Sequence, residues 1–244
     1  DRMRDRIAFL ASPVNYSSAR PAWIVIACGA LIVCIAMGVR ATASVFMPPL
    51  TAANGWSREA FSLAFAVQNL VWGFANPVFG AISDRLGAGR AIAGSAVLYV
   101  LGLALMAVSG TPAGLLGSSG VLVGLGLAGT TFGVVLGVVA RHVAPEKRSA
   151  ALGLTAAGGS VGQFVMLPVA QGLIGTFDWQ MALFMMAAIA ALIVPLAAGM
   201  TGRAAPHDGP AQSIGEALGE VARHRTFHYL FWSYFTCGFH TAFI

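Results

Sequence analysis

Charged residues are scarce in this chain: Asp, Glu, Lys and Arg make up 9% of its 244 residues. Soluble globular domains carry about 25% charged residues, so the composition excludes that class. Apolar residues account for 57% of the chain, and its mean hydropathy is +0.78. The chain is therefore predicted to reside in a lipid bilayer.

The scarcity of cysteines and of acidic residues in the apolar stretches restricts the chemistry that the chain could perform. The chain has three cysteines, Cys28, Cys34 and Cys237, and their spacing matches neither a disulfide framework nor a metal site. No Asp or Glu lies inside any long apolar stretch, whereas an intramembrane enzyme needs clustered catalytic side chains. We therefore predict no metal, no cofactor and no enzymatic activity.

Long apolar stretches are what the chain does contain. A membrane-spanning helix needs about 20 mostly apolar residues. Six stretches meet this requirement, and a seventh opens near residue 227: they are 22–50, 59–82, 91–109, 113–140, 149–175 and 180–200. Ser57, Thr111 and Asp178 are placed to cap the helices that follow them. The fold class is predicted to be an all-α membrane protein.

These stretches give a predicted domain organisation. A basic segment at 1–21 precedes a six-helix domain at 22–200. A linker at 201–225 contains the capping-box pattern Ser213-x-x-Glu216 and an amphipathic helix. Residues 226–244 are predicted to be a truncated seventh transmembrane helix, and the chain is expected to be an N-terminal fragment.

Basic residues gather in alternate loops, before the first stretch and after the second, fourth and sixth. They are Arg2, Arg4, Arg6, Arg20, Arg85, Arg90, Arg141, Lys147, Arg148, Arg203, Arg223 and Arg225. The positive-inside rule then places the N-terminus in the cytoplasm. The net charge of +5 therefore reflects membrane topology, and no nucleic-acid partner is predicted. The predicted location is the cytoplasmic (inner) membrane, with the lipid bilayer as partner.

A short charged segment separates the second and third stretches. Its spacing resembles the signature loop between helices two and three of major facilitator superfamily transporters, although Gly89 stands where a base is expected. Five residues, called the hinge below, match that pattern: Gly80, Asp84, Arg85, Gly87 and Arg90.

The resemblance implies a twelve-helix transporter built from two six-helix halves, of which this chain is the first. Its partner would be the missing C-terminal half or a second copy of the fragment. In the family, the loop that the hinge matches is thought to join the cytoplasmic ends of the halves, with the acid at Asp84 meeting groups across their interface.

Other segments are similar to one branch of that family. Pro145–Arg148, Ala157–Gly162 and Cys237–His240 resemble monocarboxylate and oxalate/formate porters. Drug antiporters have a Gly-Pro pair in helix five, whereas Leu167 precedes Pro168 here. The resemblance implies transport of a small organic anion, with proton symport as a hypothesis.

Arg40 is the candidate that most needs explanation. It lies well inside the first stretch, where a central charge costs roughly 2.5–3.5 kcal/mol. The side chain could snorkel to the outer headgroups or line a water-filled path and hold an anionic substrate. Because no acid lies inside an apolar stretch, its counter-charge must come from the missing half, solvent or substrate. We favour the substrate site.

The remaining polar candidates are weaker. Gln68, Gln163 and His240 are predicted to contribute to the substrate site, while Asn69 and Asn76 are more typical of contacts between helices. The predicted function is secondary transport of a small anionic solute by alternating access. The alternatives are a half-length, non-transporting membrane scaffold or a transporter of another small solute.

Overall fold

The computed structural model describes residues 21–200, 219 and 223–243. Residues 1–20 and nearly all of the predicted amphipathic linker helix lie outside the described residues. The chain divides into two units, residues 1–204 and 205–244, and each is described by itself.

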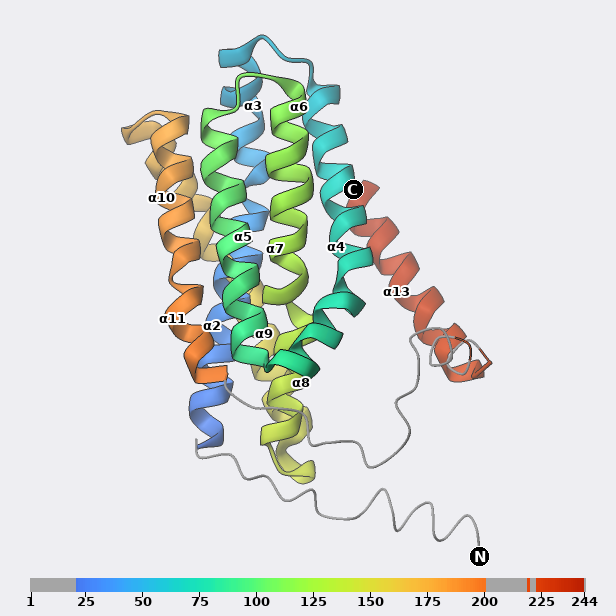
Figure 1. Cartoon of the computed structure of the whole chain (residues 1–244). Coiled ribbons are helices and arrows are strands. Elements are labelled where there is room, and N and C mark those ends of the chain that lie inside the picture. Colours follow the sequence, from blue (N-terminus) through green and yellow to red (C-terminus); the bar gives the residue numbers. More distant parts are fainter. Residues whose placement is uncertain (1–20, 201–218, 220–222, 244) are drawn as a thin grey trace, which may run out of the picture. The chain divides into compact units, whose positions relative to one another are not determined.

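Helices form every regular element in the described ranges of the first unit. The first predicted stretch forms α2 (Ala22–Ala41) and α3 (Ala43–Asn54), the second α4 (Arg58–Leu86), and the third α5 (Ala88–Val108). The fourth forms α6 (Pro112–Leu115), a π-helix η1 (Leu116–Leu122), α7 (Val123–Thr130) and α8 (Phe132–His142). The fifth forms α9 (Pro145–Thr176), and the sixth α10 (Trp179–Ala191), α11 (Ile193–Ala197) and the 3-10 helix η2 (Ala198–Met200). These elements gather into one bundle (Figure 1).

Five helical segments of the described chain are long and apolar enough to cross a membrane. They are Ala22–Asn54, Ala88–Val108, Pro112–His142, Pro145–Thr176 and Trp179–Met200. α4 has the length, at 29 residues, but the amides of Gln68, Asn69 and Asn76 lower its hydropathy. It packs against η1 and α7 inside the bundle. The prediction of an all-α, multi-pass membrane protein is confirmed.

Two adjacent prolines, Pro48 and Pro49, would be expected to end a helix, but here they lie inside one. α3 includes both and continues to Asn54, and the interruption falls earlier, at Thr42. Proline withholds a backbone donor, so Pro48 and Pro49 give no helical hydrogen bond to the carbonyls of Ser44 and Val45, four residues before them. Membrane helices tolerate this loss where neighbouring groups or local adjustments of the helix compensate for it. One turn later, the hydroxyl of Thr51 donates to the carbonyls of Met47 (2.8 Å) and Pro48 (3.1 Å).

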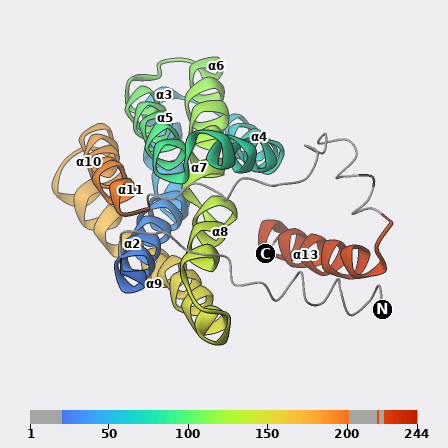
Figure 2. The same ribbon diagram turned by 60° about the horizontal axis from the view of Figure 1, so that its bottom comes forward.

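The core of the bundle lies around α2. α2 packs along α9 (Figure 2), and from α5 the fully buried Tyr99 donates its hydroxyl hydrogen to the carbonyl of Ala36 at 3.1 Å. The contact with α9 is close: a Cβ atom built on Gly162 would overlap the carbonyl oxygen of Cys34. Glycine at this position therefore allows the two backbones to touch.

The second unit contains α13 (Arg225–Phe243). Its rings form a ladder along one side, with centroid separations of 6.0, 6.4 and 6.5 Å between successive members Phe227, Phe231, Phe235 and Phe239. The four-residue spacing places these side chains on one face of the helix. The prediction that residues 226–244 are a seventh transmembrane helix stays a prediction.

Candidate functional site

Arg40 lies in the last turn of α2, midway along the 33-residue helical segment Ala22–Asn54. Its side chain is partly buried rather than extended into open solvent. A cation at this depth is expensive unless the protein or a ligand provides for it. The groups around its guanidinium therefore define the candidate site.

α4 supplies those groups from a single face. Phe65, Asn69 and Trp72 stand at positions i, i+4 and i+7, which bring three side chains to one side of a helix. The Arg40 Nη2 donates to Asn69 Oδ1 at 2.8 Å. Its Cζ lies 5.1 Å from the ring centroid of Phe65 and 4.9 Å from that of Trp72. Two aromatic rings and one neutral amide thus hold the cation.

Trp72 connects this site to the junction between α7 and α8. Its Nε1 donates to the hydroxyl of Thr131 at 3.0 Å, and that hydroxyl donates to the carbonyl of Leu127 at 2.7 Å. Thr131 occupies the break between α7 and α8, with φ −109° and ψ −162°. The ring that contacts Arg40 is therefore fixed to a point where the helix axis is interrupted.

The site is electrostatically unbalanced. Within the described ranges, one ion pair is formed, between Arg141 and Asp84, and it does not involve Arg40. The Nε of Arg40 is buried and has no hydrogen-bond partner among the described residues. An unpaired buried donor costs about 1–3 kcal/mol. The arrangement therefore leaves the positive charge of Arg40 without a counter-charge among the described residues, a charge that an anionic ligand would balance.

The structure distributes the other predicted site residues differently. Gln68 is 3% exposed, and its Nε2 donates to the carbonyl of Ser119 in η1 at 3.0 Å, so it lies in the contact between α4 and η1. Gln163 is exposed on α9. His240 belongs to α13, in the second unit, and its side chain lies outside the described residues. None of these assignments is tested, and all three stay predictions.

The residues beside Arg40 were weighed differently in the sequence. The sequence pattern assigns Asn69 to contacts between helices and does not identify Phe65 or Trp72 as part of the site. The available signal was their spacing: an amide flanked by two aromatics at i−4 and i+3 on the stretch that follows the embedded arginine.

The hinge forms the junction between α4 and α5. α4 contains Pro77 and bends toward α8 in its lower part (Figure 1), as expected where a proline interrupts helical hydrogen bonds. Gly87 then turns the chain with φ +94°, a conformation that favours glycine. The remaining hinge residues Gly80, Arg85 and Arg90 flank this turn.

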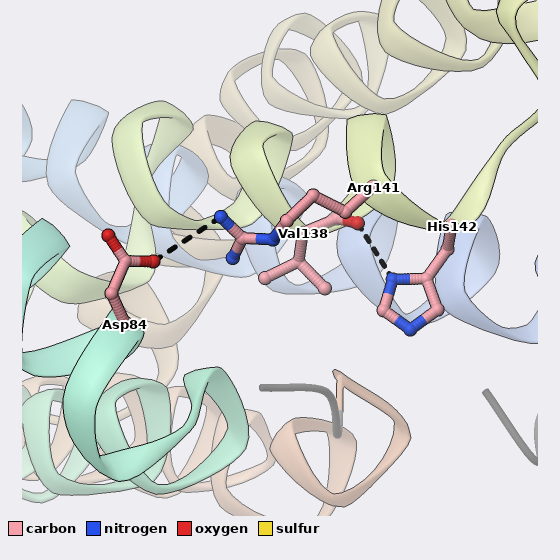
Figure 3. A network of polar contacts seen from close by, with 4 residues as sticks. All are labelled: Asp84, Val138, Arg141 and His142. Carbon is pink, nitrogen blue, oxygen red and sulfur yellow. Dashed lines mark hydrogen bonds and ion pairs between the residues drawn. The ribbon is translucent and has the colours of Figure 1, made fainter. Parts of the chain in front are cut away.

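The bend places Asp84 beside α8. Figure 3 shows its carboxylate directed at Arg141, with Asp84 Oδ1 3.4 Å from Arg141 Nη1. The next residue, His142, has its Nδ1 2.8 Å from the carbonyl of Val138. The partner of Asp84 described here thus belongs to the same bundle, and a role for Asp84 between two halves stays a prediction.

We expect Asp84→Asn to change stability little. The side chains of Arg141 and Asp84 are 36% and 54% exposed, and exposed ion pairs contribute about 0.2–1 kcal/mol. Thermal unfolding of the purified full-length protein should show a small decrease that disappears at high salt. Arg141→Gln should match it, and the double variant should be no worse than either. A loss above about 2 kcal/mol would contradict a solvent-screened pair.

Comparison with known proteins gives consistent matches. Human monocarboxylate transporter 11 is 30% identical over 195 residues, covering 78% of this chain and 40% of the relative. The mouse protein of the same name is 30% identical over 182 residues, covering 72% and 39%. Bovine monocarboxylate transporter 13 is 26% identical over 205 residues, covering 84% and 48%. The chain therefore spans less than half the length of these relatives.

The family model described as Major Facilitator Superfamily matches residues 29–244, which include the Arg40 site, the hinge and α13. This match agrees with the hinge spacing and with the bundle of apolar helices. The chain belongs to the major facilitator superfamily of membrane transporters.

Proposed function

We propose that the protein is a secondary transporter of small organic anions, most simply monocarboxylates, and that Arg40 anchors the substrate charge. One observation carries this proposal: a guanidinium lies at mid-span, stacked against two rings and bonded to a neutral amide, with no carboxylate partner in the described ranges.

Energetics favour an anionic ligand over a purely structural cation. A single bond to Asn69 leaves the buried Nε donor unpaired, while a charge-assisted bond to a carboxylate contributes about 1.5–3 kcal/mol. Such a bond is comparable with the roughly 2.5–3.5 kcal/mol cost of the embedded charge. The substrate would thus satisfy the cation that the protein leaves unbalanced.

The number of cations at the site favours a substrate with a single negative charge. The other described arginines and lysines lie near helix ends: Arg58, Arg85, Arg90, Arg141, Lys147, Arg148, Arg223 and Arg225. Arg40 alone among them stands at mid-span, so the described site balances one carboxylate better than two. The names of the relatives, monocarboxylate transporters 11 and 13, support the same substrate class.

The transport cycle follows from the family. We propose that this bundle rocks against the C-terminal half, or against a second copy, so that a midplane site faces each side alternately. Gln163 would join the site, and a proton would be carried with the anion. In this scheme the N-terminus and the hinge are cytoplasmic, the location is the inner membrane, and residues 201–225 link the two halves.

Uptake into proteoliposomes tests the substrate class. The full-length protein should take up labelled glycolate saturably, and excess glycolate should compete with the label. Glycolamide, which has the same size but no charge, should compete at least about tenfold less well because it forms no charge-assisted bond. Equal competition by the amide would contradict an anion site at Arg40.

A further inference from the structure

We infer that Asn69 is a positioning residue, which orients Arg40 for the substrate while leaving the positive charge of Arg40 uncancelled. This inference rests on the proposed function and adds to it the reason why an amide stands at position 69. It assigns to Asn69 a role in anion affinity, beyond the contact between helices that the sequence suggested.

The amide of Asn69 is held in one orientation. Its Nδ2 donates to the carbonyl of Phe65 at 2.9 Å, and its Oδ1 accepts from Arg40 Nη2 at 2.8 Å. The two ends of an amide have opposite hydrogen-bonding roles. If the amide were rotated by half a turn, its NH2 group would face the guanidinium of Arg40, a donor facing a donor. Its oxygen would then face the carbonyl oxygen of Phe65, an acceptor facing an acceptor. The backbone of α4 therefore fixes the acceptor toward Arg40.

The aromatic neighbours restrict the cation further. Phe65 and Trp72 contribute rings whose centroids lie 5.1 and 4.9 Å from Arg40 Cζ, distances at which a guanidinium is attracted to a ring face. Trp72 is in turn fixed by its bond to Thr131. With one Nη2 donor occupied by Asn69 and the Nε enclosed by protein, the guanidinium has a defined direction, and a ligand would bind through the remaining Nη donors.

The neutrality of Asn69 is the decisive property. A carboxylate at the same position would place an acceptor at the same distance, but it would also form a permanent ion pair with Arg40. An opposite charge at this range cancels the field that attracts an anion, and in a poorly solvated site this effect is strong. An asparagine provides the hydrogen bond without competing with the substrate for the charge.

Asn69→Asp separates this role from packing. Aspartate has nearly the same shape and keeps the Oδ1 acceptor, so a residue that only packs helices would tolerate it with little change in glycolate uptake. If Asn69 positions and preserves the Arg40 charge, the KM for glycolate should rise at least about tenfold, because the introduced carboxylate competes for the cation. The maximal rate per folded protein should change less than KM.

Asn76→Asp is the matched control. It makes the same substitution on the same helix, two turns further along, where Asn76 lies beside Gly133; the hydrogen bond that Arg40 donates to α4 goes to Asn69. Its KM for glycolate should stay within about twofold of the parent value, because the Coulomb interaction falls with distance and a carboxylate two turns away does not take the place of Asn69 as the acceptor for Arg40. Size-exclusion profiles and thermal unfolding of both variants verify that the protein is folded.

The outcomes distinguish this inference from the proposed function. A raised KM in Asn69→Asp with an unchanged KM in Asn76→Asp supports it. A normal KM in Asn69→Asp, together with defective uptake in Arg40→Gln, overturns the role of Asn69 and leaves the anion site standing. Normal uptake in Arg40→Gln overturns both. If Asn69→Asp does not fold, Asn69→Leu takes its place: it removes the acceptor, and an unchanged KM would overturn the inference.

Discussion

Replacing Arg40 with glutamine is expected to lower the transport efficiency for a monocarboxylate by about 10- to 150-fold, the equivalent of losing a charge-assisted bond of roughly 1.5–3 kcal/mol. Glutamine retains a polar side chain but removes the charge, the unpaired Nε donor and the contacts with the rings of Phe65 and Trp72. The measurement is the initial rate of glycolate uptake by the full-length protein in proteoliposomes, over a range of concentrations.

The Arg40→Lys variant separates the effect of the charge from the effect of the planar guanidinium. Lysine keeps the charge but lacks the planar group that stacks on rings and offers several donors at once. We expect uptake between that of the parent and that of Arg40→Gln, with the deficit mainly in KM. Undiminished uptake in the glutamine variant would exclude Arg40 as the charge anchor, whatever the lysine variant does.

Adding a methyl group at Gly162 is expected to destabilise the bundle by about 1–3 kcal/mol, the usual cost of overpacking. The new Cβ would overlap the carbonyl oxygen of Cys34, and a backbone atom cannot move aside as a flexible side chain can. Gly162→Ala should therefore force α2 and α9 apart. Thermal unfolding of the purified full-length protein measures the loss.

Gly153→Ala provides the control with the opposite sign. Gly153 is exposed on the same helix, and a Cβ there would meet nothing within 4 Å. Alanine is the better helix former by about 1 kcal/mol, so this variant should be neutral or slightly more stable than the parent. A Gly162→Ala protein as stable as Gly153→Ala would show that the α2–α9 contact can relax, contrary to our expectation.

Much of the helical framework was predictable because its signals are local. Ser57 and Thr111 accept hydrogen bonds from Ala60 and Gly114 at the starts of α4 and α6, and Asp178 accepts one from Met181 at the start of α10. Each cap needs only neighbouring residues. The hinge was recognisable because its spacing resembles a signature loop of the family, and its turn likewise depends on one local residue, a glycine with positive φ at position 87.

The interruptions within helices were not predictable from local pattern. The π-helical turns of η1 lie in a glycine- and serine-rich run with no proline. In that run the carbonyl of Ser119 accepts a hydrogen bond from the Nε2 of Gln68, which lies 51 residues away in sequence on α4. Thr131 likewise marks a break that is bonded to Trp72, 59 residues away. Such features depend on the neighbouring helix, which the sequence of one segment does not specify.

The choice between Gln68 and Asn69 shows the same limit. Adjacent residues on a helix point about 100° apart, so the rotation of α4 about its own axis decides which amide meets Arg40. The sequence favoured Gln68 for the substrate site. In the bundle, packing against η1 turns Gln68 inward and leaves Asn69 beside the cation.

The stacking of Trp72 on Arg40 gives the protein a native optical reporter. Indole emission responds to a charge held near the ring, and here the ring face lies 4.9 Å from the guanidinium carbon. A ligand that draws the cation away would therefore alter the light emitted by Trp72 without any added label. The sequence has four other tryptophans. Exchanging these, and any others in the full-length protein, for phenylalanine would isolate the Trp72 signal and allow the occupancy of the site to be followed in real time.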